Sequence, residues 1–306
     1  MRLVFAGTPS AAVPTLRRLA ISHEIAAVVT RPDAPLGRRR VLTPSPVAQA
    51  AEELGLPVIR TAKLDDAATA EITSLNAELG VIVAYGGLVR EPLLSTPAAG
   101  WINLHFSLLP AWRGAAPVQR ALIAGDRTLG ASVFQLVAEL DAGDVFAMRE
   151  VSLSETATAG EALDALAADG AELTATVVDA IENGTAVAVP QEGEPTSAKK
   201  LTLVDGLLDW SQPLEAVFAR FRGVTPEPGA HTTVEGLPFK ILEAVPAFDA
   251  APLGAGQIRG TKTALHIGTA TGALAVTRVQ PAGKGAMNAL DWWRGQRDTE
   301  NLKAGS

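Results

Sequence analysis

The sequence predicts an α/β fold in which a mostly parallel, Rossmann-like sheet is followed by a small β-rich domain. Apolar strands alternate with helical segments across residues 2–182, and residues 79–84 are apolar throughout. Beyond residue 206 the pattern changes to short strands separated by glycine turns. Alternating strands and helices form a parallel sheet that is covered on both faces. Short strands with glycine turns are instead typical of a small barrel.

The elements of the first part follow from apolar runs and from their start and stop signals. The strands are expected at residues 2–6, 24–29, 57–60, 79–84, 130–137 and 145–151. Helices are expected between them at about residues 11–20, 45–54, 65–76, 115–124 and 158–182. Pro44 and Pro46 suit the first turn of the second helix, and Asn183-Gly184 is a favourable stop for the last one. Residues 30–41, which contain two prolines, a glycine and three consecutive arginines, are expected to be irregular.

The last hundred residues predict a second domain. A helix is expected at residues 214–221, a hairpin at 232–241, and short strands at 263–268 and 273–279. A polar stretch rich in proline and glycine precedes them and reads as a linker. We therefore expect a first domain at 1–189, a linker at 190–206 and a second domain at 207–306, because 306 residues exceed one typical domain.

Composition excludes several classes of function. The chain has no cysteine, which rules out disulfides, thiol nucleophiles and thiolate metal sites, and its four scattered histidines argue against a zinc cluster. We expect no metal. No apolar run reaches the roughly 20 residues that a membrane span requires, so a cytoplasmic enzyme with no membrane partner is expected.

The charge is unevenly distributed. Residues 1–206 carry 16 Lys and Arg against 24 Asp and Glu, a net charge of −8, whereas residues 207–306 carry 10 against 9, a net charge of +1. A net charge of −7 for the whole chain argues against nucleic acid. Any contact with RNA must therefore be local.

The first strand leads into a turn that resembles a dinucleotide-binding loop only in part. Gly7 is followed by Pro9 and Ala12, so the second and third glycines of the G-x-G-x-x-G pattern are missing. The backbone is then not free to approach a pyrophosphate closely. The sequence argues against a nicotinamide cofactor.

The strongest candidate site lies where the apolar strand that begins at Trp101 ends. Asn103 and His105 are two residues apart in an extended segment, so their side chains project to the same side. An amide donates hydrogen bonds without carrying charge, and an imidazole exchanges protons near neutral pH. The carboxylate of Asp141 is suited to orient that imidazole. This set fits attack on a carbonyl-like carbon, although an isolated Asn-x-His pattern more often marks a buried structural histidine.

The complete motif is far more specific than the pair. It reads Asn103-Leu104-His105-Phe106-Ser107-Leu108-Leu109-Pro110, then Trp112-Arg113-Gly114, then Leu140-Asp141-Ala142-Gly143-Asp144. It resembles the 10-formyltetrahydrofolate-dependent formyltransferases, and most closely the branch of that family that acts on methionyl-tRNA. The resemblance extends from Arg2 to about Leu290. It implies that Asn103, His105 and Asp141 are catalytic and that 10-formyltetrahydrofolate donates the one-carbon group.

The resemblance also implies binding residues. The folate is expected to contact Ser107, Leu108, Leu109, Pro110, Tyr85, Gly86 and Asp144. The acceptor stem of an initiator tRNA is expected to contact Arg38, Arg39 and Arg40 in the first domain and Lys284 in the second. The second domain is expected to be an OB-like barrel, and the protein a monomer.

Two alternatives share parts of these features. The same Asn-His-Asp motif serves formyl transfer to glycinamide ribonucleotide or to an amino sugar, or hydrolysis of the formylfolate; the arginine run and the second domain argue against these. A catalytically inactive RNA-binding module is the alternative from another class. The intact Asn103, His105 and Asp141 argue against it.

Overall fold

The computed structural model describes residues 1–37, 40–297 and 299–306, and it divides into two compact units. The first unit contains Met1–Pro117, Thr128–Ser152 and Leu163–Ala198. The second contains Val118–Arg127, Leu153–Ala162 and Lys199–Ser306. The chain therefore passes between the units more than once, and the linear boundaries at residues 189 and 206 stay a prediction.

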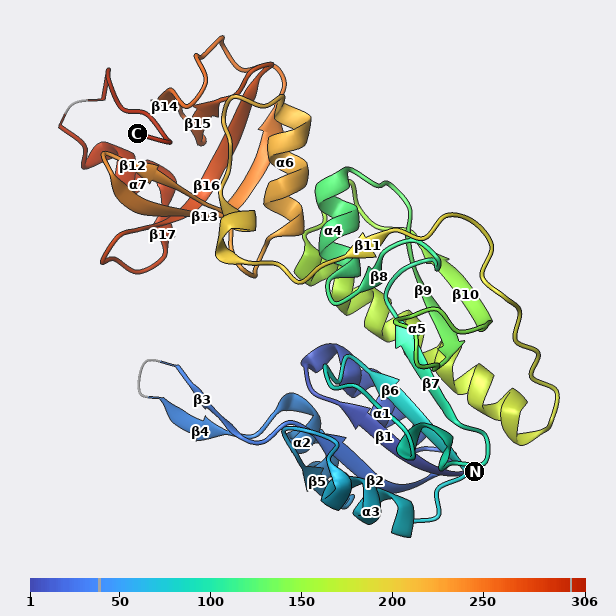
Figure 1. The fold of residues 1–306 in the computed structure, drawn as a ribbon. Coiled ribbons are helices and arrows are strands. Elements are labelled where there is room, and N and C mark those ends of the chain that lie inside the picture. Colours follow the sequence, from blue (N-terminus) through green and yellow to red (C-terminus); the bar gives the residue numbers. More distant parts are fainter. Residues whose placement is uncertain (38–39, 298) are drawn as a thin grey trace. The chain divides into compact units, whose positions relative to one another are not determined.

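A seven-stranded sheet forms the centre of the first unit (Figure 1). Its strands are β1 (Arg2–Gly7), β2 (Glu24–Thr30), β5 (Val58–Arg60), β6 (Leu79–Val83), β7 (Trp101–His105), β9 (Leu129–Gln135) and β10 (Val145–Val151). The order is β10-β9-β7-β6-β1-β2-β5; the pairs from β5 to β7 are parallel, and β9 is antiparallel to both β7 and β10. The predicted mostly parallel, Rossmann-like sheet is confirmed.

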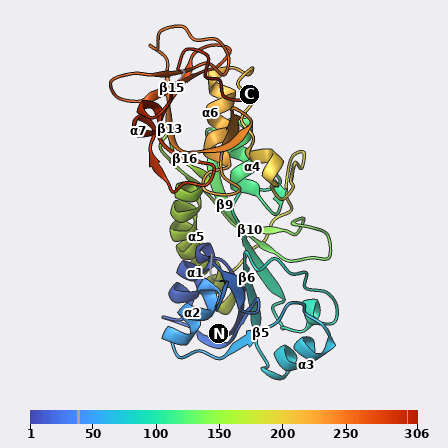
Figure 2. The same cartoon turned by 90° about the vertical axis from the view of Figure 1, so that its left-hand side faces the viewer.

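Helices cover both faces of this sheet (Figure 2). They are α1 (Val13–Leu19), α2 (Pro46–Glu53), α3 (Asp66–Ser74) and α5 (Ala159–Glu182). The side chains of Ser45 and Asp65 cap α2 and α3 by accepting a backbone N–H three residues ahead, at 3.0 and 3.1 Å. Such caps satisfy amides that the first helical turn leaves without partners. Among the described residues, no helix combines the length and the apolar character that crossing a membrane requires.

The contact between β6 and β7 depends on a glycine. Gly80 pairs with Trp101 across the two strands, and a Cβ atom at Gly80 would lie only 2.1 Å from the Trp101 ring. The indole N–H donates to the carbonyl of Leu93 at 2.8 Å, so the buried ring has its polar atom satisfied. This packing fixes β7, the strand that carries the candidate site.

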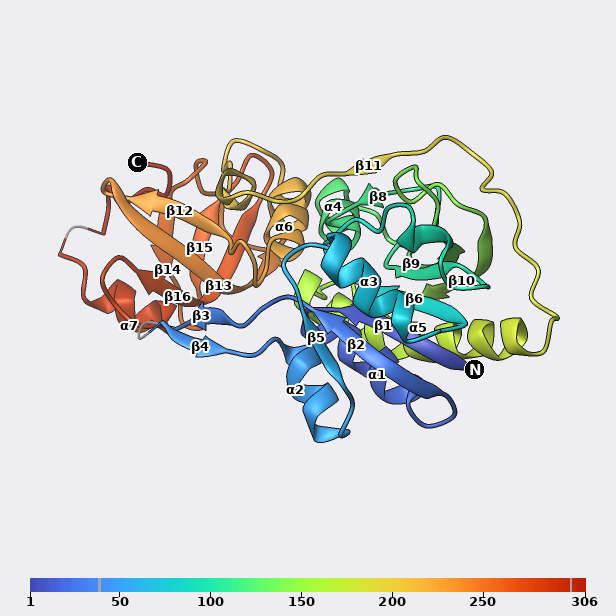
Figure 3. The same ribbon diagram turned by 60° about the horizontal axis from the view of Figure 1, so that its bottom comes forward.

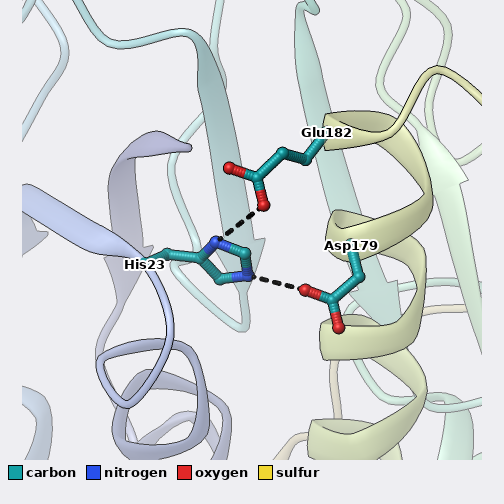
Figure 4. Close-up of side chains that lie close together, drawn as sticks. All are labelled: His23, Asp179 and Glu182. Atoms are coloured by element: carbon teal, nitrogen blue, oxygen red, sulfur yellow. Dashed lines mark ion pairs between the residues drawn. The ribbon is translucent and has the colours of Figure 1, made fainter.

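A histidine joins α5 to the segment that precedes β2 (Figure 4). His23 Nε2 lies 3.2 Å from Asp179 and its Nδ1 lies 3.7 Å from Glu182, while the side chain of His23 is buried. Each of the two carboxylates faces a different nitrogen of the His23 ring. The N-terminal amine of Met1 also pairs with Glu182. We interpret this group as an ion-pair junction between elements of the first unit.

The segment expected to be irregular contains a hairpin instead (Figure 3). Strands β3 (Ala34–Leu36) and β4 (Val41–Thr43) pair antiparallel, with Leu36 opposite Val41. Gly37 and Arg40 have positive φ values of 71° and 50°, and the amide of Arg40 donates to the carbonyl of Gly37. Gly37 directly follows β3, and a glycine adopts a positive φ without steric cost, so the glycine that suggested irregularity is compatible with the hairpin.

The second unit is built on an antiparallel sheet with the order β12-β13-β16-β15-β14, to which β17 adds by pairing with β16. Its strands are β12 (His231–Val234), β13 (Leu237–Ala247), β14 (Ile258–Gly260), β15 (Leu265–Gly268), β16 (Ala273–Pro281) and β17 (Met287–Asn288). Its helices are α4 (Pro117–Ala124), most of which belongs to this unit, α6 (Leu214–Gly223) and α7 (Ala289–Arg294). The sheet agrees with the predicted small barrel domain; β14, β17 and α7 were not predicted.

The apolar core of the second unit joins the sheet to its helices. Phe239 on β13 packs on Trp292 of α7 with ring centroids 4.6 Å apart. Phe221 on α6 belongs to the same buried cluster. A Cβ atom at Gly223, where α6 ends, would lie 2.6 Å from Ile123 of α4, so α4 and α6 approach closely there. Helix α4, which the sequence assigned to the first domain, therefore packs in the second unit.

Candidate functional site

The candidate site begins at the carboxyl end of β7, where open α/β sheets bind their ligands. Asn103 and His105 project from the same side of this strand, opposite Phe134 and Ser132 of β9. The side-chain oxygen of Asn103 is buried and has no hydrogen-bond partner among the described residues. A buried amide atom without a partner is costly, so this one is suited to a polar group of a ligand.

The imidazole of His105 is bound through Nε2 and faces a carboxylate with Nδ1. Its Nε2 lies 2.9 Å from the carbonyl oxygen of Trp112, and its Nδ1 lies 3.8 Å from Oδ2 of Asp141. A carbonyl only accepts, so Nε2 donates the hydrogen and the neutral ring presents the Nδ1 lone pair on the side of Asp141. Burial lowers the pKa of His105, and the nearby carboxylate of Asp141 and the bond to Trp112 offset this only in part. His105 is therefore a neutral base at physiological pH.

Asp141 lies in the loop between β9 and β10. Its carboxylate accepts the backbone N–H of Gly114 at 2.7 Å, and only 9% of the side chain is exposed to solvent. Its φ of 49° lies in the left-handed region, which Asp tolerates better than most residues. Gly143 brings the loop against β9, because a Cβ atom there would lie 1.8 Å from the carbonyl oxygen of Gln135. The loop conformation thus places the carboxylate beside His105.

The segment after His105 forms a fixed loop. The Ser107 hydroxyl donates to the carbonyl of Ala111 at 2.5 Å, and its own carbonyl accepts the hydroxyl of Ser132 at 2.7 Å. The amide of Leu109 donates to the same Ser132 hydroxyl at 3.1 Å. Leu108 and Pro110, two further predicted folate contacts, lie in this loop and are half-buried. Their role in binding folate stays a prediction.

Other predicted folate contacts lie at two places in the first unit. Asp144 is exposed, and with Gly143 it lines a depression of about 250 Å³ that begins at the end of β9. Gly86 is exposed, whereas the Tyr85 ring is buried in the apolar core. The guanidinium of Arg31 donates to the carbonyl of Gly86 at 2.6 Å. Near Tyr85, a ligand would therefore contact the backbone.

The predicted tRNA contacts are only partly described. Arg38 and Arg39 lie outside the described residues. Arg40 is exposed beside β4 in the first unit, and Lys284 is exposed in the turn between β16 and β17 of the second. The backbone amide of Lys284 donates to the carbonyl of Pro281 at 3.1 Å, which leaves its ammonium on the surface of a short turn.

The sequence did not reveal the residues that hold the side chains of His105 and Asp141 in place. The carbonyl of Trp112 and the amide of Gly114 are backbone groups, which carry no side-chain signature. Gln191 donates to the carbonyl groups of Asp141 and Gly143, and the Thr196 hydroxyl accepts the amide of Trp112 at 2.8 Å. Gln191 and Thr196 lie in the polar stretch that was expected to be a linker.

Both parts of the chain match known family models. Residues 1–178 match the model described as formyl transferase, and residues 200–297 match that of the formyl transferase C-terminal domain. The chain belongs to the formyl transferase family.

Several curated relatives share one name, methionyl-tRNA formyltransferase. The relative from Clavibacter sepedonicus is 64% identical, over 96% of this chain and 97% of its own length. The relative from Arthrobacter sp. strain FB24 is 50% identical over 99% of both chains. The relative from Streptomyces coelicolor is 48% identical over 100% of both chains. The similarity therefore includes both units.

Solved structures share the fold at low identity. An N-formyltransferase from Helicobacter canadensis, in complex with folinic acid and dTDP-3-aminofucose, has a TM-score of 0.70 at 15% identity, covering 91% of this chain and 98% of its own. HypX from Aquifex aeolicus, in complex with tetrahydrofolic acid, has a TM-score of 0.61 at 17% identity. That match covers 95% of this chain and 46% of HypX, so the chain spans about half the length of that protein.

Proposed function

We propose that this formyl transferase transfers the formyl group of 10-formyltetrahydrofolate to the α-amine of methionyl-tRNA, giving the N-formylmethionyl-tRNA that initiates translation. The observation that carries the chemistry is the buried side-chain oxygen of Asn103, which has no described partner, on the strand whose His105 faces Asp141. The names and the near-complete coverage of the curated relatives support the acceptor. The amino-sugar and glycinamide ribonucleotide alternatives are not favoured by these relatives.

Asn103 acts on the formyl oxygen. When the amine attacks the formyl carbon, that oxygen gains negative charge, and a buried amide donor stabilises it without reorganising. An amide carries both a donor and an acceptor on one flat group, and the assignment of its two atoms rests on partners. The buried atom without a partner is the amide oxygen, and no described hydrogen bond holds the carboxamide in that orientation, so a half-turn of the amide presents its N–H to the substrate. Asn103 thereby accounts for oxyanion stabilisation.

His105 and Asp141 act on the proton of the attacking amine. The neutral imidazole presents Nδ1 as a base, and the carboxylate of Asp141 stabilises the imidazolium that forms. The new bond joins the α-nitrogen to the formyl carbon, and the bond from that carbon to N10 of the folate breaks. The proton removed from the amine ends on N10 of the leaving tetrahydrofolate. The reaction requires no covalent enzyme intermediate.

The binding assignments belong to the same proposal. The folate contacts the loop of Ser107 to Pro110, the backbone near Gly86, and the depression beside Asp144. The acceptor stem contacts the arginine run, which includes Arg40, and Lys284. We expect the protein to act as a monomer in the cytoplasm, where aminoacyl-tRNA is used.

The test is a comparison of formyl acceptors. Radiolabelled 10-formyltetrahydrofolate is offered with methionyl-tRNA, with free methionine, with glycinamide ribonucleotide and with an amino sugar nucleotide. Label in methionyl-tRNA alone is the expected result. Label in a small-molecule amine overturns the proposed acceptor, and release of formate without any acceptor indicates a hydrolase.

A further inference from the structure

Gln191 lies in the segment that follows α5, and its carboxamide is held between two parts of the site. Its Oε1 accepts two N–H groups of the Arg113 guanidinium, at 2.7 and 3.2 Å. Its Nε2 donates to the carbonyl of Asp141 at 2.8 Å and to that of Gly143 at 2.9 Å. A guanidinium only donates and a carbonyl only accepts, so the four partners determine which way the amide faces.

We infer that Gln191 is a positioning residue for formyl transfer, which holds the carboxylate of Asp141 at its distance from His105 through the backbone of the Asp141 loop. This inference rests on the proposed function, in which Asp141 acts together with His105. Gln191 itself touches neither His105 nor the Asp141 carboxylate in any described contact, so its effect passes through the loop.

The contacts around Asp141 form a closed ring. Gly114 donates its N–H to the carboxylate of Asp141, and the neighbouring Arg113 binds Gln191, which binds the Asp141 backbone. The strand β8 (Arg113–Gly114) therefore holds Asp141 at two points. Without the Gln191 bonds, the Gly114 amide and the contact of the following residues with Gln135 of β9 would have to keep a residue at a positive φ in place. Such conformations persist only when the surrounding structure determines them.

The gap between Asp141 and His105 is sensitive to movement of the loop. The 3.8 Å between Oδ2 and Nδ1 is longer than a hydrogen bond, so the carboxylate acts on the imidazole by charge. Asp141 is the charged group whose field raises the pKa of His105 against the effect of burial. The hydrogen bond to the Trp112 carbonyl also raises the pKa of His105. A second charged pair lies at the edge of the site, where the guanidinium of Arg113 is 3.8 Å from the carboxylate of Glu139.

The direct test follows the His105 imidazole by NMR as pH is varied. The chain has four histidines, so the signals are few, and loss of one signal in a His105→Gln variant assigns it. Gln191→Met keeps the length of the side chain and removes the amide. Gln49→Met is the matched control, because Gln49 lies in α2 and its amide donates to the carbonyl of Pro44 at 2.9 Å. We expect a lower His105 pKa in Gln191→Met and no change in Gln49→Met.

Turnover provides a second measurement. A displaced catalytic group costs about tenfold to a hundredfold in kcat, so we expect Gln191→Met to lose activity on that scale while the KM for methionyl-tRNA is retained. The amide of Gln191→Asn is one methylene too short to reach both Arg113 and the backbone of the Asp141 loop, so this variant should also lower the pKa of His105. In an Asp141→Asn background, Gln191→Met should cause no further shift.

The inference is overturned if folded Gln191→Met and Gln191→Asn proteins show wild-type His105 titration and wild-type kcat. An equal shift in Gln49→Met also overturns it, because the effect would then not depend on the Asp141 loop. The titration needs no substrate. A wild-type protein that fails to formylate methionyl-tRNA would therefore refute the proposed function while the titration still decided whether Gln191 positions Asp141.

Discussion

Nδ1 of His105 faces Oδ2 of Asp141 across 3.8 Å, while Nε2 of the same ring is bound to the carbonyl of Trp112. The bond to Trp112 fixes the tautomer, and the distance to Asp141 leaves the Nδ1 lone pair unshared. The imidazole is thus held neutral, buried and close to a carboxylate. This arrangement is suited to accepting a proton from an amine and stabilising the resulting cation.

The pH dependence of activity follows from that relationship. Burial lowers the pKa of His105, so the acid limb of kcat/KM for formyl transfer should fall below the ordinary histidine value of about 6.5. In Asp141→Asn the negative charge that raises this pKa is lost, and the acid limb should move to still lower pH. Formyl-transfer rates measured from pH 5 to 8 locate the acid limb of the wild type and of Asp141→Asn. An acid limb in Asp141→Asn at or above that of wild type would contradict the assignment.

Asn103→Ala should slow formyl transfer without unfolding the protein. Loss of one oxyanion donor costs about 10² to 10³ in kcat. The amide of Asn103 has a buried oxygen without a described partner, so its removal should leave thermal stability near that of wild type or above it. Asn183→Ala is the control, since that amide binds a backbone carbonyl at the end of α5. Equal kcat values for Asn103→Ala and wild type would remove Asn103 from the mechanism.

Gly143→Ala should destabilise the first unit and reduce activity together. The added Cβ would lie 1.8 Å from the carbonyl oxygen of Gln135, so the Asp141 loop must move away from β9. Overpacking of this kind costs about 1–3 kcal/mol, and more where backbone must shift. Gly254→Ala is the control, because the nearest atom to a Cβ there is 3.8 Å away. Thermal unfolding and kcat are measured for both; a fully stable, fully active Gly143→Ala protein would argue against the close packing.

Lys284→Ala tests the second unit. If Lys284 binds a tRNA phosphate, its loss should raise the KM for methionyl-tRNA, leave the KM for the folate unchanged, and reduce the salt slope of binding by about 1. Lys262, which is exposed in the turn before β15, provides the control Lys262→Ala. Identical salt slopes for Lys284→Ala and Lys262→Ala would exclude a specific phosphate contact at Lys284.

The sequence predicted the strand that carries Asn103 and His105 because an apolar run followed by polar residues marks the end of a buried strand. It predicted Asp141 through the motif. The groups that hold these side chains could not be found in this way, since the Trp112 carbonyl and the Gly114 amide are backbone atoms. Gln191 was missed because a polar stretch without periodicity carries no signal of what it contacts.

The hairpin of β3 and β4 and the packing of α4 show a different limit. Three-residue strands are too short for a periodic pattern to reveal, so proline and glycine dominated the interpretation of residues 30–41. The pattern of α4 predicted a helix, but the partner of that helix is set by tertiary contacts such as that of Ile123 with Gly223. Local patterns predict elements more reliably than they predict which elements pack together.

The most direct test of the central claim is a double-mutant cycle on methionyl-tRNA formylation. It compares kcat for wild type, His105→Ala, Asp141→Asn and the double variant under single-turnover conditions. Residues that act as one unit are strongly non-additive, so the double variant should lose about as much as the worse single variant, roughly 10² to 10⁴. Losses that multiply would contradict joint action, and wild-type turnover in both single variants would contradict the active-site assignment altogether.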